Sequence, residues 1–462
     1  MSRPTPGHAI TMRVSAPAGF SATSELTAAA AEAGAEITAL DIIGSTHEHI
    51  IVDITCNTEG DDHAVKVADA VNALPGVEVG KVSDRTFLMH IGGKLSVEPK
   101  VELRTRDDLS RAYTPGVARV CLAIAKNPAD ARRLTIKRNT VAVVTDGTAV
   151  LGLGDIGPAA ALPVMEGKAA LFKRFAGVDA WPVCLDTKDT EEIIMIVKAM
   201  APVYGGINLE DISAPRCFEI ERRLRDELDI PVFHDDQHGT AIVVLAALIN
   251  ALRVVEKDIE SARIVVSGAG AAGHAIIQLL HAQGAGPIVA CDRKGAIDRT
   301  RTYEDPHRQW IADNTNPENF SGSLHDAMAG ADVFIGVSAP GVIEEQHVAT
   351  MAPGGIVLAL ANPDPEIHPL DAAKHATVVA TGRSDFPNQI NNVLAFPGLF
   401  RGLLDSNASD ITTPMLVAAA QAIADCVNPD ELNASYIIPS VFDPEVAGKV
   451  AQAVVANSTP TA

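Results

Sequence analysis

Two short stretches place pairs of acids at the ends of apolar segments. INLEDISAP contains Glu210 and Asp211, and IPVFHDDQHGT contains Asp235 and Asp236. If both segments are strands of a parallel sheet, their carboxyl ends open into one crevice, where ligands bind in such sheets. Four carboxylates there repel one another unless a cation joins them, and oxygen ligands without thiols suit a hard ion such as Mg²⁺ or Mn²⁺. Each pair taken alone is as well explained by acids that cap a helix N-terminus.

A lysine lies on the apolar face of a predicted helix. In PVMEGKAALFKRFAG, a helix from about Glu166 has a face with the 3.6-residue spacing, formed by Lys168, Leu171, Phe172 and Phe175. Such a lysine can extend its ammonium out to water. It can also act as a base, because apolar surroundings near a helix N-terminus disfavour its protonated form.

Tyr113 is a second candidate for proton transfer. In SRAYTPGVARV it comes just before Thr114 and Pro115, which suit an N-cap and a first helical position. A helix N-terminus stabilises a phenolate and so lowers the pKa of a tyrosine. Simple packing is the more ordinary explanation of one such tyrosine. His234 and His238 flank the second acid pair, and we do not propose them as site residues.

The pattern G-x-G-x-x-G occurs twice, as GLGDIG at 152–157 and as GAGAAG at 268–273. The second copy follows the apolar segment RIVVS, opens a helical run, and is followed about 20 residues later by an acid at the end of PIVACD, as in dinucleotide-binding folds. Pyrophosphate would bind at the helix N-terminus and ribose hydroxyls at the acid. The predicted cofactor contacts are Gly268, Ala269, Gly270, Ala271, Ala272, Gly273 and Asp292.

The acid at 292 favours NAD, although Arg293 and Lys294 are able to accommodate the 2′-phosphate of NADP. The first glycine motif is followed by Pro158 and Pro163 rather than at once by a long helix. We therefore expect GLGDIG to be a loop that packs closely against another part of the protein.

These residues require a scaffold of alternating strands and helices. Beyond about residue 140, apolar segments alternate with helical ones, which predicts parallel sheets covered by helices. Residues 10–92 follow the order strand, helix, strand, strand, helix, strand of a ferredoxin-like domain. The predicted class is α/β, with a ferredoxin-like domain at 1–95, a substrate- and metal-binding α/β domain at 96–250, and a Rossmann-type doubly wound domain with C-terminal helices at 251–462.

Composition limits the partners. The 462 residues carry a formal net charge of −21, which repels nucleic acid and anionic lipid. The six cysteines have no metal or redox spacing, the first residues, MSRPTPGHAITMRV, lack the apolar core of a signal peptide, and the longest apolar run, 240–252, is shorter than the ~20 residues needed to span a bilayer. We expect a cytoplasmic protein that binds neither nucleic acid nor membranes.

From about Tyr113 to Gly402 the motifs follow the order seen in malic enzymes, which are divalent-metal-dependent. They are YTPGVA, VTDGTAVLGLGDIG, PVMEGKAALFKRFAG, INLEDISAP, FHDDQHGTA, GAGAAG, ALANPDPE and GRSDFPNQINNVLAFPG. The chain resembles a bacterial-type short malic enzyme whose N-terminal part is similar to an ACT domain, a small regulatory module. The resemblance implies oxidative decarboxylation of L-malate to pyruvate with NAD or NADP, a homodimer or higher homo-oligomer, and an effector site in the ACT domain.

The resemblance also implies a role for individual residues. These are Tyr113 as general acid, Lys168 as general base, Asp235 beside the catalytic centre, Glu210, Asp211 and Asp236 as metal ligands, and Asn362 and Asn392 as contacts of substrate and nicotinamide. Ala149 stands where longer eukaryotic-type malic enzymes carry an arginine that holds the substrate carboxylate.

Three alternatives remain open. A dehydrogenase that does not decarboxylate fits the glycine motif, but most such enzymes need no acid pairs. A metabolite-sensing ACT protein with an inactive scaffold has no need to retain Tyr113 and Lys168. A malolactic reaction, which converts malate to lactate and keeps the cofactor bound, is compatible with the same residues.

Overall fold

The structure, a computed structural model, describes residues 4–19, 21–150 and 152–458. It divides into two compact units, residues 1–96 and 97–462. The boundaries within the second unit, near residue 250, stay a prediction.

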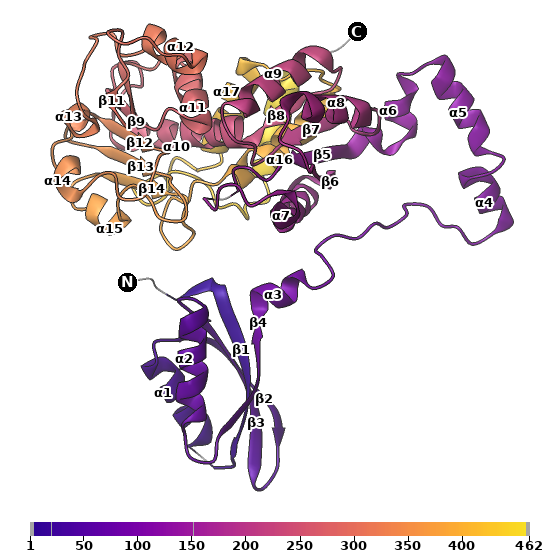
Figure 1. The fold of residues 1–462 in the computed structure, drawn as a ribbon, viewed down its shortest axis with the longest axis vertical. Helices are drawn as coiled ribbons and strands as arrows, with labels where there is room; N and C mark the ends of the chain where they lie inside the picture. The colour runs from indigo at the N-terminus through magenta and orange to yellow at the C-terminus, as the bar shows by residue number, and fades with distance from the viewer. Residues whose placement is uncertain (1–3, 20, 151, 459–462) are drawn as a thin grey trace. The chain divides into compact units, whose positions relative to one another are not determined.

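The first unit is a four-stranded antiparallel sheet in the order β2-β3-β1-β4, with α1 and α2 against one face (Figure 1). From β1 to β4 the order of elements is the one predicted from the sequence, but the predicted last strand ends at Asp84 and residues 85–90 form a helix instead. The elements are β1 (Thr5–Pro17), α1 (Ala22–Glu32), β2 (Glu36–Ser45), β3 (His49–Thr58), α2 (Asp61–Asn72) and β4 (Glu78–Asp84), followed by α3 (Arg85–His90). The two-residue period of β1 buries Met12 and Val14, while Arg13 between them faces out and pairs with Asp53 at 2.7 Å.

The second unit begins with short helices and a parallel sheet in the order β6-β5-β7-β8. The helices before the sheet are α4 (Arg106–Ala112), α5 (Val117–Lys126), α6 (Asp130–Leu134) and the 3₁₀ turn η1 (Ile136–Asn139). The sheet and its helices are β5 (Thr140–Thr145), α7 (Pro158–Ala176), β6 (Asp179–Cys184), α8 (Thr190–Met200), η2 (Ala201–Val203), β7 (Gly206–Leu209), α9 (Arg216–Glu227) and β8 (Val232–His234). Strands β5 and β7 are buried along their whole length, as expected of apolar strands covered on both faces.

A buried helix follows the first sheet. The π-helix η3 (Asp235–Gly239) continues directly into α10 (Thr240–Val254), most of whose residues are buried. By length and composition Asp235–Val254 is able to cross a membrane, but 72% of its apolar window is buried inside the protein. The segment is therefore a buried core helix of this unit.

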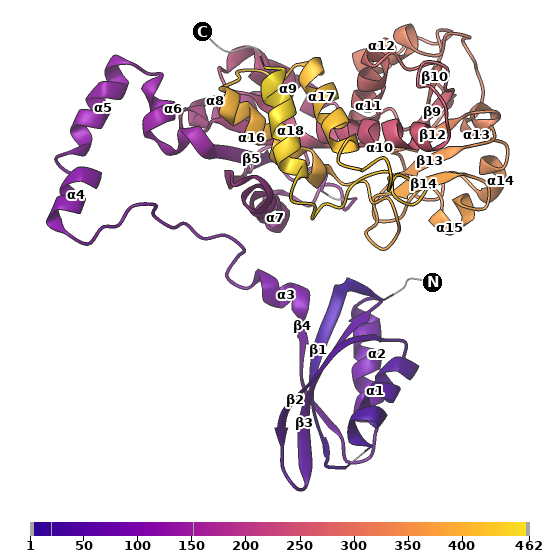
Figure 2. The same cartoon turned by 180° about the vertical axis from the view of Figure 1, so that it is seen from behind.

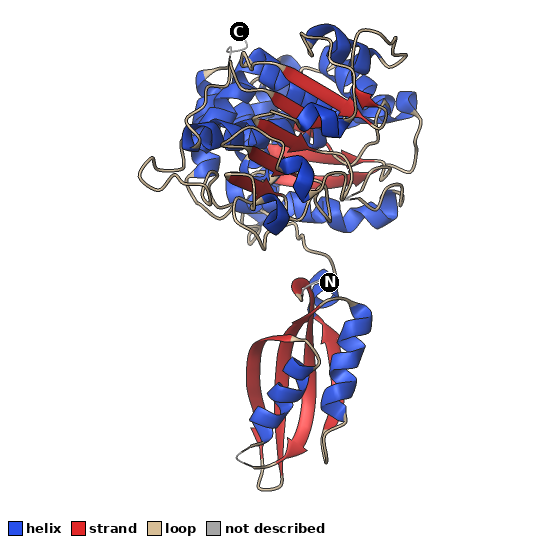
Figure 3. Cartoon of the chain, turned by 90° about the vertical axis from the view of Figure 1, so that its left-hand side faces the viewer, coloured by secondary structure: helices blue, strands red, loops and turns tan. Residues whose placement is uncertain are grey.

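The second sheet has the order β11-β10-β9-β12-β13-β14 and is parallel except for β11. Figure 3 draws the strands of this unit in red among its helices in blue. Its strands are β9 (Ile264–Ser267), β10 (Ile288–Asp292), β11 (Gly295–Ala296), β12 (Val333–Gly336), β13 (Ile356–Ala359) and β14 (Val378–Thr381). Its helices are α11 (Ala271–Ala282), α12 (Pro306–Asn314), α13 (Leu324–Met328), α14 (Glu345–Val348) and α15 (Pro369–Ala372). The strand order reverses at β9, and dinucleotides bind at such a switch point.

The C-terminal helices pack on the first sheet as well as on α10. They are η4 (Asn392–Leu394), α16 (Phe396–Ser406), α17 (Thr413–Ala424) and α18 (Val446–Ala456). Helix α18 packs against both α16 and α17, and these three helices lie close together in Figure 2. The rings of Phe396 and Phe400 lie 4.7 and 5.3 Å from that of Phe172 on α7. The range 251–462 thus supplies helices to both sheets.

Candidate active site

The carboxyl ends of β7 and β8 bring the two predicted acid pairs together. Glu210 and Asp211 follow β7, while Asp235 and Asp236 form the first turn of η3 directly after β8. Because β7 and β8 are parallel neighbours, these ends share one edge of the sheet. The structure therefore brings the two acid pairs together at one edge of the sheet, as predicted from the sequence.

Three of these acids form a group suited to a metal ion. One carboxylate oxygen from each of Glu210, Asp211 and Asp236 lies within 4.8 Å of the others. Glu210 and Asp211 are buried, and the backbone N–H of Asp211 donates to Asp236 Oδ2 at 2.9 Å. Buried carboxylates this close are unfavourable without a counter-charge, and an all-oxygen group of this kind fits Mg²⁺ or Mn²⁺.

Lys168 projects from α7 between two of the acids. Its Nζ lies 2.6 Å from Asp235 Oδ2 and 2.9 Å from Glu210 Oε1, and 4.2 Å from the centre of the Phe396 ring. The side chain is 11% exposed, so the ammonium is held by these acids rather than by water. The choice of Lys168 as a site residue therefore agrees with its position, and it does not extend out to solvent.

Two expectations about this helix are wrong. The helix α7 begins at Pro158, immediately after the first glycine motif, and contains Pro163, rather than starting near Glu166. Proline is tolerated at the first helical position because the N–H that it lacks has no helical partner there.

The second correction concerns the pKa of Lys168. Burial lowers it, but the charges of Asp235 and Glu210 outweigh burial and hold it well above its ordinary value. In the same cluster, burial and the neighbouring carboxylates raise the pKa of Glu210 against the opposing charge of Lys168. The lysine is thus an ammonium here, and not the neutral amine that apolar surroundings alone would favour.

Residues that the sequence analysis did not select hold the acids in place. The side chain of Asn208, in the middle of β7, donates to Glu210 Oε2 at 2.8 Å. Asn392, which was selected, donates to Asp235 Oδ2 at 3.1 Å. A polar residue inside the otherwise apolar strand GINL is the signal that identifies Asn208.

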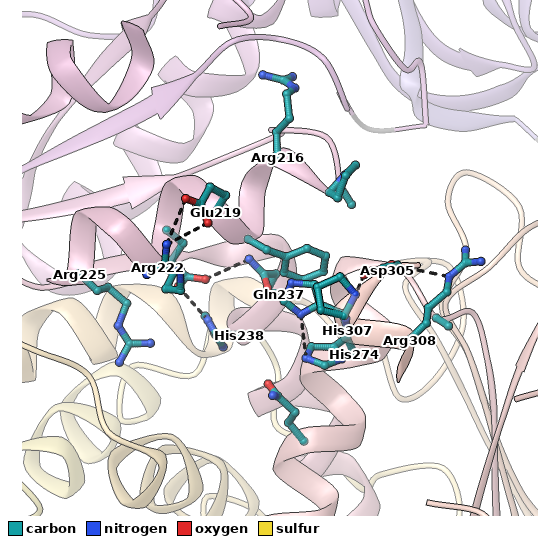
Figure 4. Close-up of a pocket in the computed structure, with 18 of the residues that line it drawn as sticks. Arg216, Glu219, Arg222, Arg225, Gln237, His238, His274, Asp305, His307 and Arg308 are labelled. Carbon is teal, nitrogen blue, oxygen red and sulfur yellow. Dashed lines mark hydrogen bonds and ion pairs between the residues drawn. The ribbon is translucent and has the colours of Figure 1, made fainter. Parts of the chain in front are cut away.

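Glu221 on α9 holds the π-helix η3 in place through contacts with three residues of the segment 234–238. Its carboxylate accepts hydrogen bonds from the side chain of Gln237 at 3.0 Å and from the backbone of His234 at 3.3 Å, and it lies 2.8 Å from His238 Nε2. Gln237 and His238 face a cavity of about 1180 Å³ between α9, α11 and residues 304–308 (Figure 4). Glu221 is one of several acids on a highly charged helix, so its residue type and position did not identify it.

The first glycine motif forms the predicted close-packed loop. A Cβ on Gly152 would lie 2.8 Å from the carbonyl oxygen of Asn362, so this loop touches the second sheet's domain through bare backbone. The N–H of Ala149 donates to the carbonyl oxygen of Asp211 at 3.0 Å, which places this position beside the acids. Asn362, selected as a substrate contact, is exposed at this loop.

The second glycine motif lies where a dinucleotide fold needs it. Gly268 follows β9 with φ +112°, and a Cβ on Gly273 would lie 1.9 Å from Gly268 O, so both positions require glycine. Residues 269–272 lead into α11, whose N-cap is Gly270. Asp292 ends β10 and lines a cavity of about 840 Å³ together with Arg293 and Lys294.

Tyr113 is not part of the acid cluster in this chain. It is the C-cap of α4 and its side chain is 67% exposed. Among the described residues no hydrogen bond, ion pair or ring contact links it to Lys168 or to the acids. The helix after it begins at Val117 with Gly116 as N-cap, so the prediction that Thr114 and Pro115 start that helix is wrong.

Comparisons with known proteins agree with this arrangement. Family models described as "Malic enzyme, N-terminal domain" and "Malic enzyme, NAD binding domain" match residues 92–225 and 237–459. The NAD-dependent malic enzyme of Geobacillus stearothermophilus is 60% identical over 446 residues, 96% of this chain and 93% of that protein. The bifunctional malic/malolactic enzyme of Bacillus subtilis is 56% identical over 365 residues, 78% of this chain and 89% of that protein. A crystal structure of an NAD-dependent malic enzyme from Thermotoga maritima has a TM-score of 0.78 at 48% identity, covering 82% of this chain and all of that one.

Proposed function

Because this chain belongs to the malic enzyme family, we propose that the acid cluster around Lys168 is the place where L-malate is oxidised and decarboxylated to pyruvate. The chain is a decarboxylating oxidoreductase with an NAD-binding domain. The observation that carries the site assignment is the position of Lys168, 2.6 Å from Asp235 and 2.9 Å from Glu210 at the sheet edge that also holds Asp211 and Asp236.

NAD is the cofactor that the relatives support. Asp292 at the end of β10 suits the ribose hydroxyls, since a carboxylate accepts hydrogen bonds from both of them. Arg293 and Lys294 line the same cavity and would favour a 2′-phosphate, which leaves use of NADP as a second possibility for this site.

Mg²⁺ or Mn²⁺ would be held by Glu210, Asp211 and Asp236, whose oxygens already converge. When bound, such an ion supplies positive charge that polarises the C2 oxygen of the substrate and opposes the protonation of Lys168. Asn208 would keep the Glu210 carboxylate oriented, because its amide occupies the second oxygen.

The chain's own groups then have separate tasks. Lys168 takes the proton of the C2 hydroxyl as hydride passes to the nicotinamide, and Asp235 holds the lysine at that position. Asn392 and Asn362 orient the substrate and the nicotinamide from the second domain. The family resemblance assigns to Tyr113 the donation of a proton to C3 after CO₂ has left, and the structure itself leaves this side chain exposed outside the acid cluster.

We further propose that residues 1–95 are an ACT-type regulatory domain that binds a small effector. The antiparallel order β2-β3-β1-β4 with two helices supports this, and so does the match to the Geobacillus enzyme, which extends over 96% of the chain. Deletion of residues 1–95 should then abolish the response to an effector while the activity with malate remains. We also propose that the protein is cytoplasmic, which fits six cysteines without metal or redox spacing, and that it is a homo-oligomer, which only the family resemblance supports.

The malolactic reaction is the second candidate, because the Bacillus subtilis relative is described as a malic/malolactic enzyme. One assay separates the two: reduction of NAD or NADP by L-malate with Mn²⁺, with and without a chelator, and quantification of pyruvate against lactate. We expect pyruvate, reduced NAD and full loss of activity with chelator. The Lys168→Ala variant should have a kcat roughly 10²–10⁴-fold lower than the wild type. Lactate without net NAD reduction would favour the malolactic reaction, and activity that survives the chelator would contradict the metal site.

A further inference from the structure

We propose that Glu366 is a positioning residue of the cofactor site, and that its buried negative charge favours the positively charged nicotinamide ring of NAD⁺ over the neutral ring of NADH. This role rests on the proposed function, because a nicotinamide cofactor must bind at the second sheet for the charge to act on it. Glu366 closes the motif ALANPDPE, from which only Asn362 has a task in the reaction described above.

The carboxylate of Glu366 joins the ends of neighbouring strands. Its Oε1 accepts from the backbone N–H of Ser338, two residues after β12, at 2.8 Å. Its Oε2 accepts from the backbone N–H of Ala361, two residues after β13, at 3.0 Å. The hydroxyl of Ser338 lies 3.3 Å from the same Oε1 and 3.0 Å from the hydroxyl of Ser267, the last residue of β9. One carboxylate thus connects the carboxyl ends of β9, β12 and β13.

A glycine leaves the room that this carboxyl group occupies. A Cβ on Gly336, the last residue of β12, would stand 2.4 Å from Glu366 Cδ and 2.7 Å from its Oε1. The side chain of Glu366 is 0% exposed. A group packed this closely against a strand cannot shift without losing contacts, so its charge is held at a defined place.

The charge of Glu366 has no cationic partner in the described part of the chain. Asp364, two residues earlier, pairs with Arg383 at 3.7 Å, whereas no ion pair among the described residues involves Glu366. Burial raises the pKa of Glu366, and the N–H groups of Ser338 and Ala361 oppose this because they favour the ionised form. A buried carboxylate of this kind favours a positive charge that arrives with a ligand.

The order of the strands directs the nicotinamide half of the cofactor towards Glu366. Asp292, the proposed acceptor of the adenosine ribose, ends β10 on one side of β9, whereas β12 and β13 lie on the other side. Ser338 lines the same cavity of about 840 Å³ as Asp292 and Gly270. A dinucleotide that spans the switch point from β10 therefore extends its nicotinamide towards the strand ends that Glu366 joins.

The oxidised and reduced cofactors differ in the charge of this ring. The nicotinamide ring of NAD⁺ is positive, and it becomes neutral when it takes up a hydride. A fixed carboxylate stabilises only the charged ring, and at an effective dielectric constant near 20 a separation of ~8 Å already changes the affinity by roughly 10-fold or more. Glu366 therefore favours binding of the cofactor that malate reduces and release of the cofactor that the reaction forms.

Equilibrium binding of NAD⁺ and of NADH to the full chain tests the proposal without any turnover. Glu366→Gln removes the charge at almost the same size, whereas Glu366→Asp keeps the charge on a side chain that is one methylene shorter. Glu366→Gln should weaken binding of NAD⁺ by ~10-fold and that of NADH by less than ~2-fold, and Glu366→Asp should keep the preference for NAD⁺. If the side chain only supported the loops, both cofactors would lose affinity equally and the shorter side chain would be the more damaging one. Either result would overturn the proposal.

Two controls separate the charge from the fold. Glu345→Gln on α14 removes an exposed acid that pairs with Lys374, and it should leave both affinities unchanged. ADP-ribose lacks the nicotinamide ring and should bind equally well to the wild type and to Glu366→Gln. A loss of affinity for ADP-ribose as large as that for NAD⁺ would overturn the proposal. In steady-state assays of Glu366→Gln, KM for NAD should rise by ~10-fold while KM for malate stays within ~2-fold of the wild type.

The wild type provides a readout that does not depend on the folding of a variant. With excess Mn²⁺ to compensate the acid cluster, it should bind NAD⁺ at least as tightly as NADH, and a preference for NADH of more than ~10-fold would overturn the role of Glu366. A wild type that binds neither cofactor would overturn the proposed function itself. Equal losses for both cofactors in Glu366→Gln, beside a wild type that reduces NAD with malate, would overturn the role of Glu366 alone.

Discussion

Substitution of Gly239 by alanine should damage catalysis far more than folding. A Cβ at this position, the last residue of η3, would stand 2.0 Å from Asp235 Oδ1 and 2.8 Å from its Cγ. Nonbonded carbon and oxygen atoms approach to ~3.3 Å. The fully buried Asp235 carboxylate must therefore move by about 1 Å, away from its bonds to Lys168 at 2.6 Å and to Asn392 at 3.1 Å.

The expected losses of stability and of catalytic rate in Gly239→Ala follow from these contacts. Forcing an extra methyl group into packed surroundings costs about 1–3 kcal/mol, which a protein of this size tolerates with a decrease of several degrees in Tm. A displacement of ~1 Å in the group that positions the base costs about 10²-fold in rate. We therefore expect Gly239→Ala to lower kcat/KM for malate by ~10²-fold while the protein remains folded.

Steady-state reduction of NAD with saturating Mn²⁺ measures kcat/KM for malate. Thermal unfolding followed by circular dichroism measures the decrease in Tm. Gly448→Ala is the matched control, because Gly448 lies inside the helix α18 and a Cβ there would meet nothing within 4 Å. That control should keep full activity and gain about 0.5–1 kcal/mol. If Gly239→Ala retained activity within ~3-fold of the control, the position of the Asp235 carboxylate would not matter for the reaction, and the reasoning from the Lys168 contacts would be refuted.

Three further predictions concern the metal, the cofactor and acid stability. Glu210→Gln should weaken Mn²⁺ binding, measured by calorimetry on the protein without substrate, by ~10–100-fold or more; Glu219→Gln, an exposed acid on α9, should leave it unchanged, and equal affinities for both variants would contradict the metal site. Asp292→Ala removes the acceptor of the ribose hydroxyls and should raise KM for NAD by roughly 10–100-fold while NADP is less affected; an unchanged NAD-to-NADP ratio would argue against its role. Burial and the neighbouring His307 lower the pKa of His274 from 6.5 to about 4. The folded state therefore resists taking up a proton that the unfolded chain accepts below its ordinary pKa, so stability is lost as the pH falls from 6.5 towards 4. Urea unfolding of His274→Gln should show a decrease in unfolding free energy between pH 7 and 4 that is up to about 3 kcal/mol smaller than in the wild type, and identical decreases would refute the assignment.

The strands and the acid pairs were predictable because parallel strands impose a simple pattern. Each of β5, β7 and β9 is an apolar run that ends in glycine or acids, and the chemistry collects where the strands end. The second glycine motif was predictable for the same reason, since strand, turn and helix must follow one another closely to bind a pyrophosphate. Local order along the chain was sufficient in both cases.

The helix starts were less predictable, because proline and glycine have several roles. Pro158 opens α7 instead of delaying it, and Pro163 lies inside that helix. At the other helix, Gly116 rather than Thr114 is the N-cap, and the N–H of Gly116 donates to the carbonyl oxygen of Ser110 at 2.7 Å. The position of a cap depends on contacts with the preceding turn, which residue types alone do not specify.

Side-chain contacts between segments far apart in the chain could not be predicted from the sequence. Glu221 and His238 lie on different elements and meet only because α9 packs behind η3. Ion pairs of this kind follow from packing, and a charged helix such as α9 offers many equivalent acids.

The charge state of Lys168 could not be predicted from the sequence, because it depends on which acids lie near its Nζ atom. Spacing identified it and the resemblance supplied its role, but neither indicated that two buried acids stand 2.6 and 2.9 Å from its Nζ. At such distances a pair of opposite charges interacts by several kcal/mol even at an effective dielectric constant near 20, which is enough to reverse the effect of burial on the lysine. An ammonium held in this way cannot accept a proton from malate. It becomes a base only when another positive charge compensates the acids, and Glu210, Asp211 and Asp236 converge at the position where that charge would be bound.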